Sequence, residues 1–103
     1  MKLEIFTVTT KLREIDKTRL EIVQTDLTRL FSGLTIIPKC LGFWLNDTEH
    51  RIEKDNIEIW LIYTKDLTFK IRKEKFLKLL TEIKDITQQK EQAYSIDNTI
   101  KFL

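Results

Sequence analysis

The chain has 103 residues, of which 33% are charged and 42% hydrophobic, and its formal net charge is +2. This size and composition predict one globular domain over residues 1–103 and exclude a disordered or collagen-like chain. No apolar run is long enough to span a bilayer and no signal peptide is present, so a cytoplasmic protein is expected. A single cysteine excludes an internal disulfide framework, and one cysteine with one histidine is too few for a structural zinc site. The two glycines cannot form a glycine-rich phosphate-binding loop. We therefore predict no metal and no cofactor.

The first third of the chain predicts a strand followed by a helix. Residues 2–12 alternate between polar and apolar side chains and include several threonines, which is typical of a strand. Asp16 is then suited to cap a helix N-terminus. Residues 17–31 carry apolar side chains at spacings of three and four, which predicts an amphipathic helix. Gly33 follows at the position where a left-handed residue often ends a helix.

The remainder predicts two further strands, a second helix and a last strand. Residues 34–45 are mostly apolar, with Pro38 marking a sheet edge or a bulge. A hairpin with a polar tip over residues 48–55 leads to a strand over 56–64. A connection over 65–70 precedes an amphipathic helix over 72–89. The final strand covers 93–103, with an interruption near Asp97 and Asn98 as an alternative.

The element order is therefore β-α-β-β-α-β. This order is that of the split βαβ, or ferredoxin-like, arrangement. We expect an α+β domain in which two helices pack on one face of a four-stranded antiparallel sheet.

The two middle strands predict self-association. Both faces of each strand are apolar, whereas a strand with one face in water should alternate. We expect Trp60, Ile62 and Trp44 on the face opposite the helices, where a second copy stacked sheet to sheet would cover them. A ligand or another protein could also cover this face, and the alternative is a monomer whose long hairpin folds over its own sheet.

Two side chains are candidates for catalysis. His50 lies among charged residues at the predicted hairpin tip and could act as a general base, although an exposed loop histidine is the simpler interpretation. Cys40 could be a nucleophile if a neighbouring charge lowered its pKa, but it lies within an apolar strand and is better explained by packing. We therefore predict no catalytic residue.

Aromatic and basic residues suggest a binding site at the hairpin. Trp44 with Arg51, supported by Lys39, could hold a flat, anionic ligand such as a nucleotide. A rival site is the segment 65–78, which has six basic and two acidic residues and is otherwise a solvated helix face. The aromatic, glycine-rich motif of single-stranded RNA modules is absent, so nucleic acid is not an expected partner.

Three short stretches carry a family resemblance. These are Gly33-Leu34-Thr35, Gly42-Phe43-Trp44 and Ile59-Trp60-Leu61-Ile62-Tyr63. Together they resemble small uncharacterised ferredoxin-like proteins of bacterial and mobile-element genomes, in which a glycine and an aromatic residue precede a hairpin and a hydrophobic strand follows. The resemblance covers about half of the chain, supports the topology and implies no catalytic residue. It also fits a phage- or plasmid-encoded protein.

The resulting hypothesis is a non-enzymatic, oligomeric binding protein. It would sequester a small anionic ligand or cover a host protein, as an inhibitor would. The alternatives are a small dimeric enzyme, which would use Tyr63, His50 or a carboxylate for proton transfer, and a nucleic-acid-binding regulator that uses the basic segment.

Overall fold

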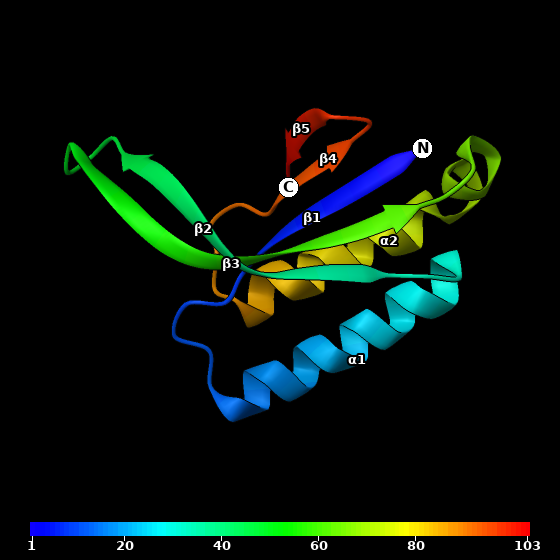
Figure 1. Cartoon of the computed structure of the whole chain (residues 1–103), viewed down its shortest axis with the longest axis horizontal. Helices are drawn as coiled ribbons and strands as arrows, with labels where there is room; N and C mark the ends of the chain where they lie inside the picture. Colours follow the sequence, from blue (N-terminus) through cyan, green and yellow to red (C-terminus); the bar gives the residue numbers. More distant parts are fainter.

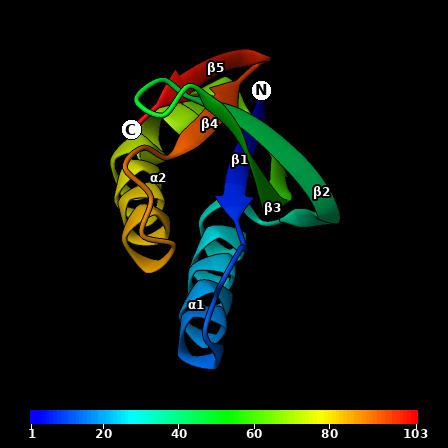
Figure 2. The same ribbon diagram turned by 90° about the vertical axis from the view of Figure 1, so that its left-hand side faces the viewer.

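The computed structural model describes residues 1–103 and has two layers, a sheet and a pair of helices (Figure 1). Five antiparallel strands form one sheet in the order β2-β3-β1-β4-β5. Both helices cover the same face of this sheet (Figure 2). The elements in chain order are β1 (Lys2–Val8), α1 (Glu14–Phe31), β2 (Thr35–Asn46), β3 (Arg51–Tyr63), α2 (Asp66–Ile86), β4 (Ala93–Ile96) and β5 (Thr99–Phe102). The predicted α+β architecture is thus confirmed, and neither helix is apolar enough to cross a membrane.

The predicted number of strands is wrong, because the C-terminal segment forms a hairpin of two strands. The turn consists of Asp97 and Asn98, whose φ angles are +47° and +69°. Asp and Asn tolerate this left-handed conformation, and two successive positive φ angles match the right-handed twist of a tight hairpin. The interruption that was considered as an alternative at Asp97 and Asn98 is therefore a tight turn. The chain reverses there, and β5 is added as an edge strand.

The core lies between the helices and the sheet, and it includes the two residues expected on the opposite face. Trp60 is 0% exposed and Ile62 is 1% exposed. Trp60 pairs with Ile5 and Ile62 with Leu3, and all four belong to the cluster that contacts the helices. The expectation that Trp60 and Ile62 form a surface for a second copy is therefore corrected. The alternation along β3 was predicted correctly from the sequence. Trp60 and Ile62 were expected on the face away from the helices, whereas they lie on the face that the helices cover.

Both helices begin earlier than the sequence pattern predicted. The Arg13 backbone N–H donates to Asp16 Oδ2 at 3.1 Å, and the Arg13 guanidinium binds the same carboxylate at 3.0 and 3.1 Å. Asp16 thus stabilises the first turn from within the helix, not from the N-cap position. The second helix starts at Asp66, and Phe69 near its start packs edge-on against Phe76 with ring centroids 5.6 Å apart. At the end of α1 the left-handed residue is Ser32, not Gly33.

The hairpin of β2 and β3 extends beyond the rest of the sheet. Along β3, pairing with β1 begins only at Ile57, which lies opposite Val8. Residues 41–56 therefore form a two-stranded ribbon, which we call the arm (Figure 1). A β-bulge between Ile37 and Cys40, with Lys39 at φ +57°, precedes the arm. Such bulges increase the local twist, and the bulge agrees with the irregularity predicted at Pro38.

Candidate functional site

The face of the sheet that no helix covers, here called the open face, leads into a groove beside the arm. This groove has a volume of about 730 Å³ and lies between the arm, β1, β5 and the segment that precedes β4. We call it the hairpin groove. Its walls include the aromatic side chains of Phe6, Trp44 and Phe102. The other side chains that the site argument uses are Asn46, Glu53, Asp55, Lys90, Glu91 and Gln92.

Alternation along the strands brings the three aromatic side chains to one face. Phe6 pairs with Ile59, Trp44 with Glu53, and Phe102 with Ala93, and all these positions share the open face. The indole of Trp44 lies over Gly42, because a Cβ atom at that glycine would be 3.0 Å from indole Cζ2. A side chain at position 42 would displace the ring. Trp44 remains 39% exposed, so part of its surface is available to a ligand.

Charge in the hairpin groove is predominantly negative. Glu53, Asp55 and Glu91 line it together with a single cation, Lys90. The Asn46 amide donates to Glu53 Oε1 at 2.9 Å, and the Arg51 guanidinium donates to the same oxygen at 3.3 Å. These hydrogen bonds, that from Asn46 first, hold the pKa of Glu53 below its ordinary value. The carboxylate is therefore ionised at neutral pH.

One wall of the groove contains a buried acceptor that has no hydrogen-bond partner. Gln92 is 1% exposed, and its Nε2 atom donates to the carbonyl oxygens of Phe6 and Ala93 at 2.9 and 3.0 Å. These two bonds fix the amide, while Oε1 is left unpartnered. Buried polar atoms are almost always paired in folded proteins, so this oxygen is an exception, and it is itself enclosed by protein atoms.

The structure places two of the three predicted binding residues, Trp44 and Arg51, on the same face of the arm. Trp44 lines the hairpin groove, whereas Arg51 lies at the end of the arm and pairs with Glu49 at 2.6 Å as well as with Glu53. Lys39 lies in the bulge at the opposite end of the arm. Trp44 pairs with Glu53 and Asn46 with Arg51, so Trp44 and Arg51 are diagonal neighbours, while the Arg51 guanidinium is engaged by Glu49 and Glu53. Lys39 is the one of the three that lies away from the others.

The residues considered for catalysis also lie apart. His50 is exposed in the turn of the arm with φ +51°, and Cys40 is half-buried next to the bulge. Tyr63 is exposed at the last position of β3, away from the arm. No nucleophile–base pair is formed among these three. No cluster of three or more His, Cys, Asp or Glu side chains is arranged to hold a metal ion.

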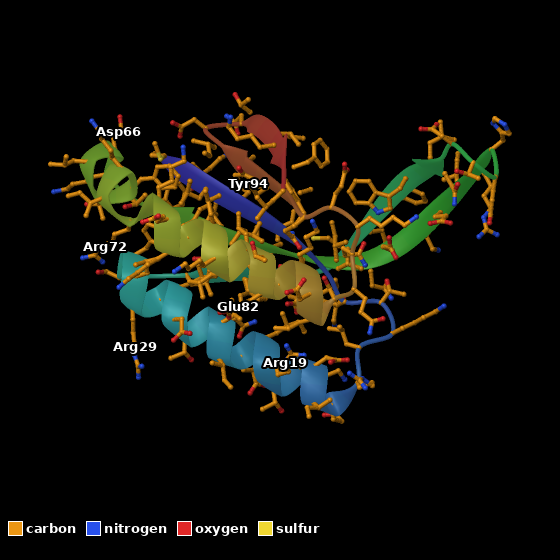
Figure 3. All side chains as sticks on the ribbon, turned by 180° about the vertical axis from the view of Figure 1, so that it is seen from behind. Arg19, Arg29, Asp66, Arg72, Glu82 and Tyr94 are labelled. Atoms are coloured by element: carbon orange, nitrogen blue, oxygen red, sulfur yellow. The ribbon has the colours of Figure 1, made fainter.

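The basic segment contributes to a second groove, of about 710 Å³, between α1 and α2. The Arg72 guanidinium donates to the Leu30 carbonyl oxygen at the end of α1 (Figure 3). Four cations and three acids line this groove: Arg29, Arg72, Lys75 and Lys78 with Asp26, Glu74 and Glu82. The excess of positive charge seen in the sequence is therefore nearly balanced where the helices meet, and no aromatic side chain accompanies it.

Sequence reasoning identified Trp44 but missed Phe6, Glu53, Gln92 and Phe102. These residues come from separate strands and the segment before β4, and no spacing in the sequence links them. The one signal available in the sequence was the alternation in β1. It places Phe6 on the same face as the polar residues Lys2 and Glu4, and therefore on the face away from the core. Phe102 joins the groove only because the last segment folds back as β5.

Comparisons with known proteins support the fold. No protein-family model and no curated protein sequence matches the chain. Among solved structures, a phage SAM lyase in complex with S-methyl-5'-thioadenosine is similar, with a TM-score of 0.65 and 12% identity over 99% of this chain and 87% of that one. The divalent cation tolerance protein Cut A1 from Thermus thermophilus has a TM-score of 0.56 and 15% identity over 100% and 82% of the two chains. CutA from Xylella fastidiosa has a TM-score of 0.53 and 17% identity over 95% and 85%. The chain thus shares its small α+β fold with these proteins.

Proposed function

We propose that this protein is an oligomeric binding protein that takes a small nucleoside-type ligand in the hairpin groove. One observation carries the proposal: three aromatic side chains and several carboxylates converge on a single groove. Aromatic surfaces such as Trp44 bind flat bases by stacking. Carboxylates such as Glu53 and Asp55 accept hydrogen bonds from ribose hydroxyls.

The charge of the groove favours a neutral or cationic ligand over the anionic one inferred from the sequence. The three acidic residues outweigh the one lysine, so the net negative charge of the groove repels a phosphate group. Glu53 contributes to this repulsion because its carboxylate is ionised. The phage SAM lyase of similar fold is bound to S-methyl-5'-thioadenosine, a nucleoside without phosphate, which supports this ligand class.

Titration calorimetry tests the proposal with S-methyl-5'-thioadenosine, adenosine and AMP as probes. We expect the two uncharged nucleosides to bind and AMP to bind more weakly. Trp44→Ala should weaken nucleoside binding by roughly 5- to 150-fold, the range that corresponds to loss of one stacking contact. Asp55→Asn should narrow the difference between adenosine and AMP, since it removes one negative charge.

The matched control changes the rival groove between the helices. Lys75→Glu combined with Lys78→Glu should leave nucleoside binding unchanged. If this double variant abolishes binding while Trp44→Ala leaves it intact, the assignment to the hairpin groove is wrong. If AMP binds more tightly than adenosine to the unchanged protein, the charge argument is wrong.

A second candidate function is a lyase reaction on SAM itself, in which the carboxylate of SAM attacks its own Cγ and closes to a lactone. The bond from Cγ to the sulfonium sulfur breaks, its electron pair stays on sulfur, and S-methyl-5'-thioadenosine leaves. The observation that favours this reaction is the negative charge of the groove, because a sulfonium ion is a cation and would be attracted there. Incubation with SAM followed by chromatography separates the two functions. Release of S-methyl-5'-thioadenosine, lost in Asp55→Asn, would support catalysis, whereas SAM that is bound and recovered unchanged would support binding alone.

Self-association is part of the proposal and is supported by apolar side chains on the open face. Ile37 and Tyr63 are exposed there, and Phe6, Ile59 and Leu61 are partly exposed between them. We call these five residues the open-face patch. It takes the place of Trp60 and Ile62 as the surface for a second copy. Sedimentation at micromolar concentration should detect a dimer or a larger species, and a monomer at every concentration would contradict this part.

A further inference from the structure

The arm has a second apolar surface, on the side opposite to Trp44. Leu41, Phe43 and Leu45 of β2 alternate with Gly42, Trp44 and Asn46, and Leu45, which also lines the edge of the hairpin groove, pairs with Ile52 of β3. These four residues form the outer stripe. Their exposed fractions lie between 53% and 71%. The helices do not extend beneath the arm (Figures 1 and 3), so nothing in the same chain covers the stripe.

An exposed stripe of this kind is unfavourable in an isolated copy. A two-stranded ribbon without further packing is at best marginally stable in water. The outer stripe exposes about 500 Å² of apolar area, if each of the four side chains has a full area of about 200 Å². This value lies in the upper part of the range for the largest apolar patch on a typical monomer, about 300–600 Å². The arm is therefore expected to pack against another molecule.

The outer stripe and the open-face patch point in opposite directions. The patch continues the side of β3 that carries Ile57 and Ile59, and Cys40 opposite Ile57 also lies on that side. The stripe lies on the other side of the same hairpin. A single copy stacked face to face would cover the patch and leave the stripe in water. Covering both requires that each copy contact its neighbour through two different surfaces.

The areas of the two surfaces fit one contact of ordinary size. The patch exposes about 300 Å² of apolar area, so a stripe against a patch would bury about 800 Å² of apolar area in total. Since roughly 57% of a typical interface is apolar, the complete contact would bury about 1,400 Å². Stable interfaces bury about 1,200–2,000 Å².

We propose that the outer stripe of one copy packs on the open-face patch of the next copy. This inference rests on the self-association in the proposed function and specifies its geometry. The contact is heterologous, so repeated application forms a closed ring if the rotation between copies closes. Every copy then buries both of its apolar surfaces, and the arm is supported by its neighbour.

Two double variants and one control test this geometry by sedimentation. Phe43→Glu with Ile52→Glu changes the stripe, and neither residue lines the hairpin groove. Ile37→Glu with Tyr63→Glu changes the patch. Each pair should raise the dissociation constant at least about 100-fold, because charges replace buried apolar area. The control Ile22→Glu, at a 58% exposed residue of α1, should leave the assembly unchanged. Circular dichroism verifies that each variant is folded.

Mixing the two double variants distinguishes a heterologous contact from a symmetric one. The stripe variant keeps its patch and the patch variant keeps its stripe, so the mixture should form a 1:1 complex although each variant alone is monomeric. A symmetric face-to-face dimer predicts no such complex, and its absence would overturn the proposal. An assembly that survives the stripe substitutions would also overturn it, while leaving association through the open face intact. Phe6 belongs to the patch and also lines the hairpin groove, so nucleoside binding is measured separately by calorimetry on the two variants, neither of which changes Phe6.

Discussion

Replacing Trp60 by alanine should destabilise the fold far more than the same change at Trp44. Trp60 is fully buried between the sheet and the helices, and its indole Nε1 donates to Glu58 Oε1 at 3.0 Å. Truncation of a buried aromatic side chain typically costs about 3–5 kcal/mol, because transfer energy is lost and a cavity remains. Domains of this size have a total stability of about 5–15 kcal/mol, so the variant should be close to unfolding.

The measurement is urea denaturation followed by circular dichroism, with a thermal melt as a second assay. At about 4–8 °C per kcal/mol, Trp60→Ala should lower the melting temperature by roughly 12–40 °C. Trp44→Ala serves as the matched control, since Trp44 is 39% exposed, and should cost less than about 1.5 kcal/mol. A cost below about 1 kcal/mol for Trp60→Ala, or a larger cost at Trp44, would show that the two faces of the sheet have been assigned wrongly.

Three further predictions concern a helix terminus, the groove and a turn. The Arg13 side-chain hydrogen bond lowers the pKa of Asp16, so this stabilisation is present above the ordinary aspartate pKa of about 4 and is lost as pH falls below it. Asp16→Asn should therefore melt at a lower temperature than the unchanged protein at pH 7, with the gap closing in acid. Gly42→Ala should weaken nucleoside binding in calorimetry by displacing the Trp44 indole, while the melting temperature changes little. Asn98→Val should lower the melting temperature because valine disfavours a φ of +69°, whereas Asn98→Gly should not; equal melting temperatures would contradict the turn assignment.

The sequence by itself determined the types and order of the elements up to β4, whereas the last segment was expected as a single strand. Period-two alternation along β1 and β3, and spacings of three and four along the helices, follow from local backbone geometry and can be recognised without a structure. The helix starts were less certain, because Asp16 stabilises α1 from its third position and Phe69 near the start of α2 packs against Phe76. These are contacts between side chains, which a periodic pattern does not encode.

The tertiary structure alone decided which side of each strand the helices cover. Both sides of β3 are apolar, so alternation separates Trp60 and Ile62 from Ile59 and Leu61 but does not say which pair meets the helices. That choice depends on where the crossover helices pack, which is a property of the whole chain. The hairpin groove has the same origin, because Phe6, Trp44, Phe102 and Gln92 meet only once five strands are aligned and the last one folds back. Convergence of side chains from distant segments is set by strand order and twist, and neither is written in any one stretch of sequence.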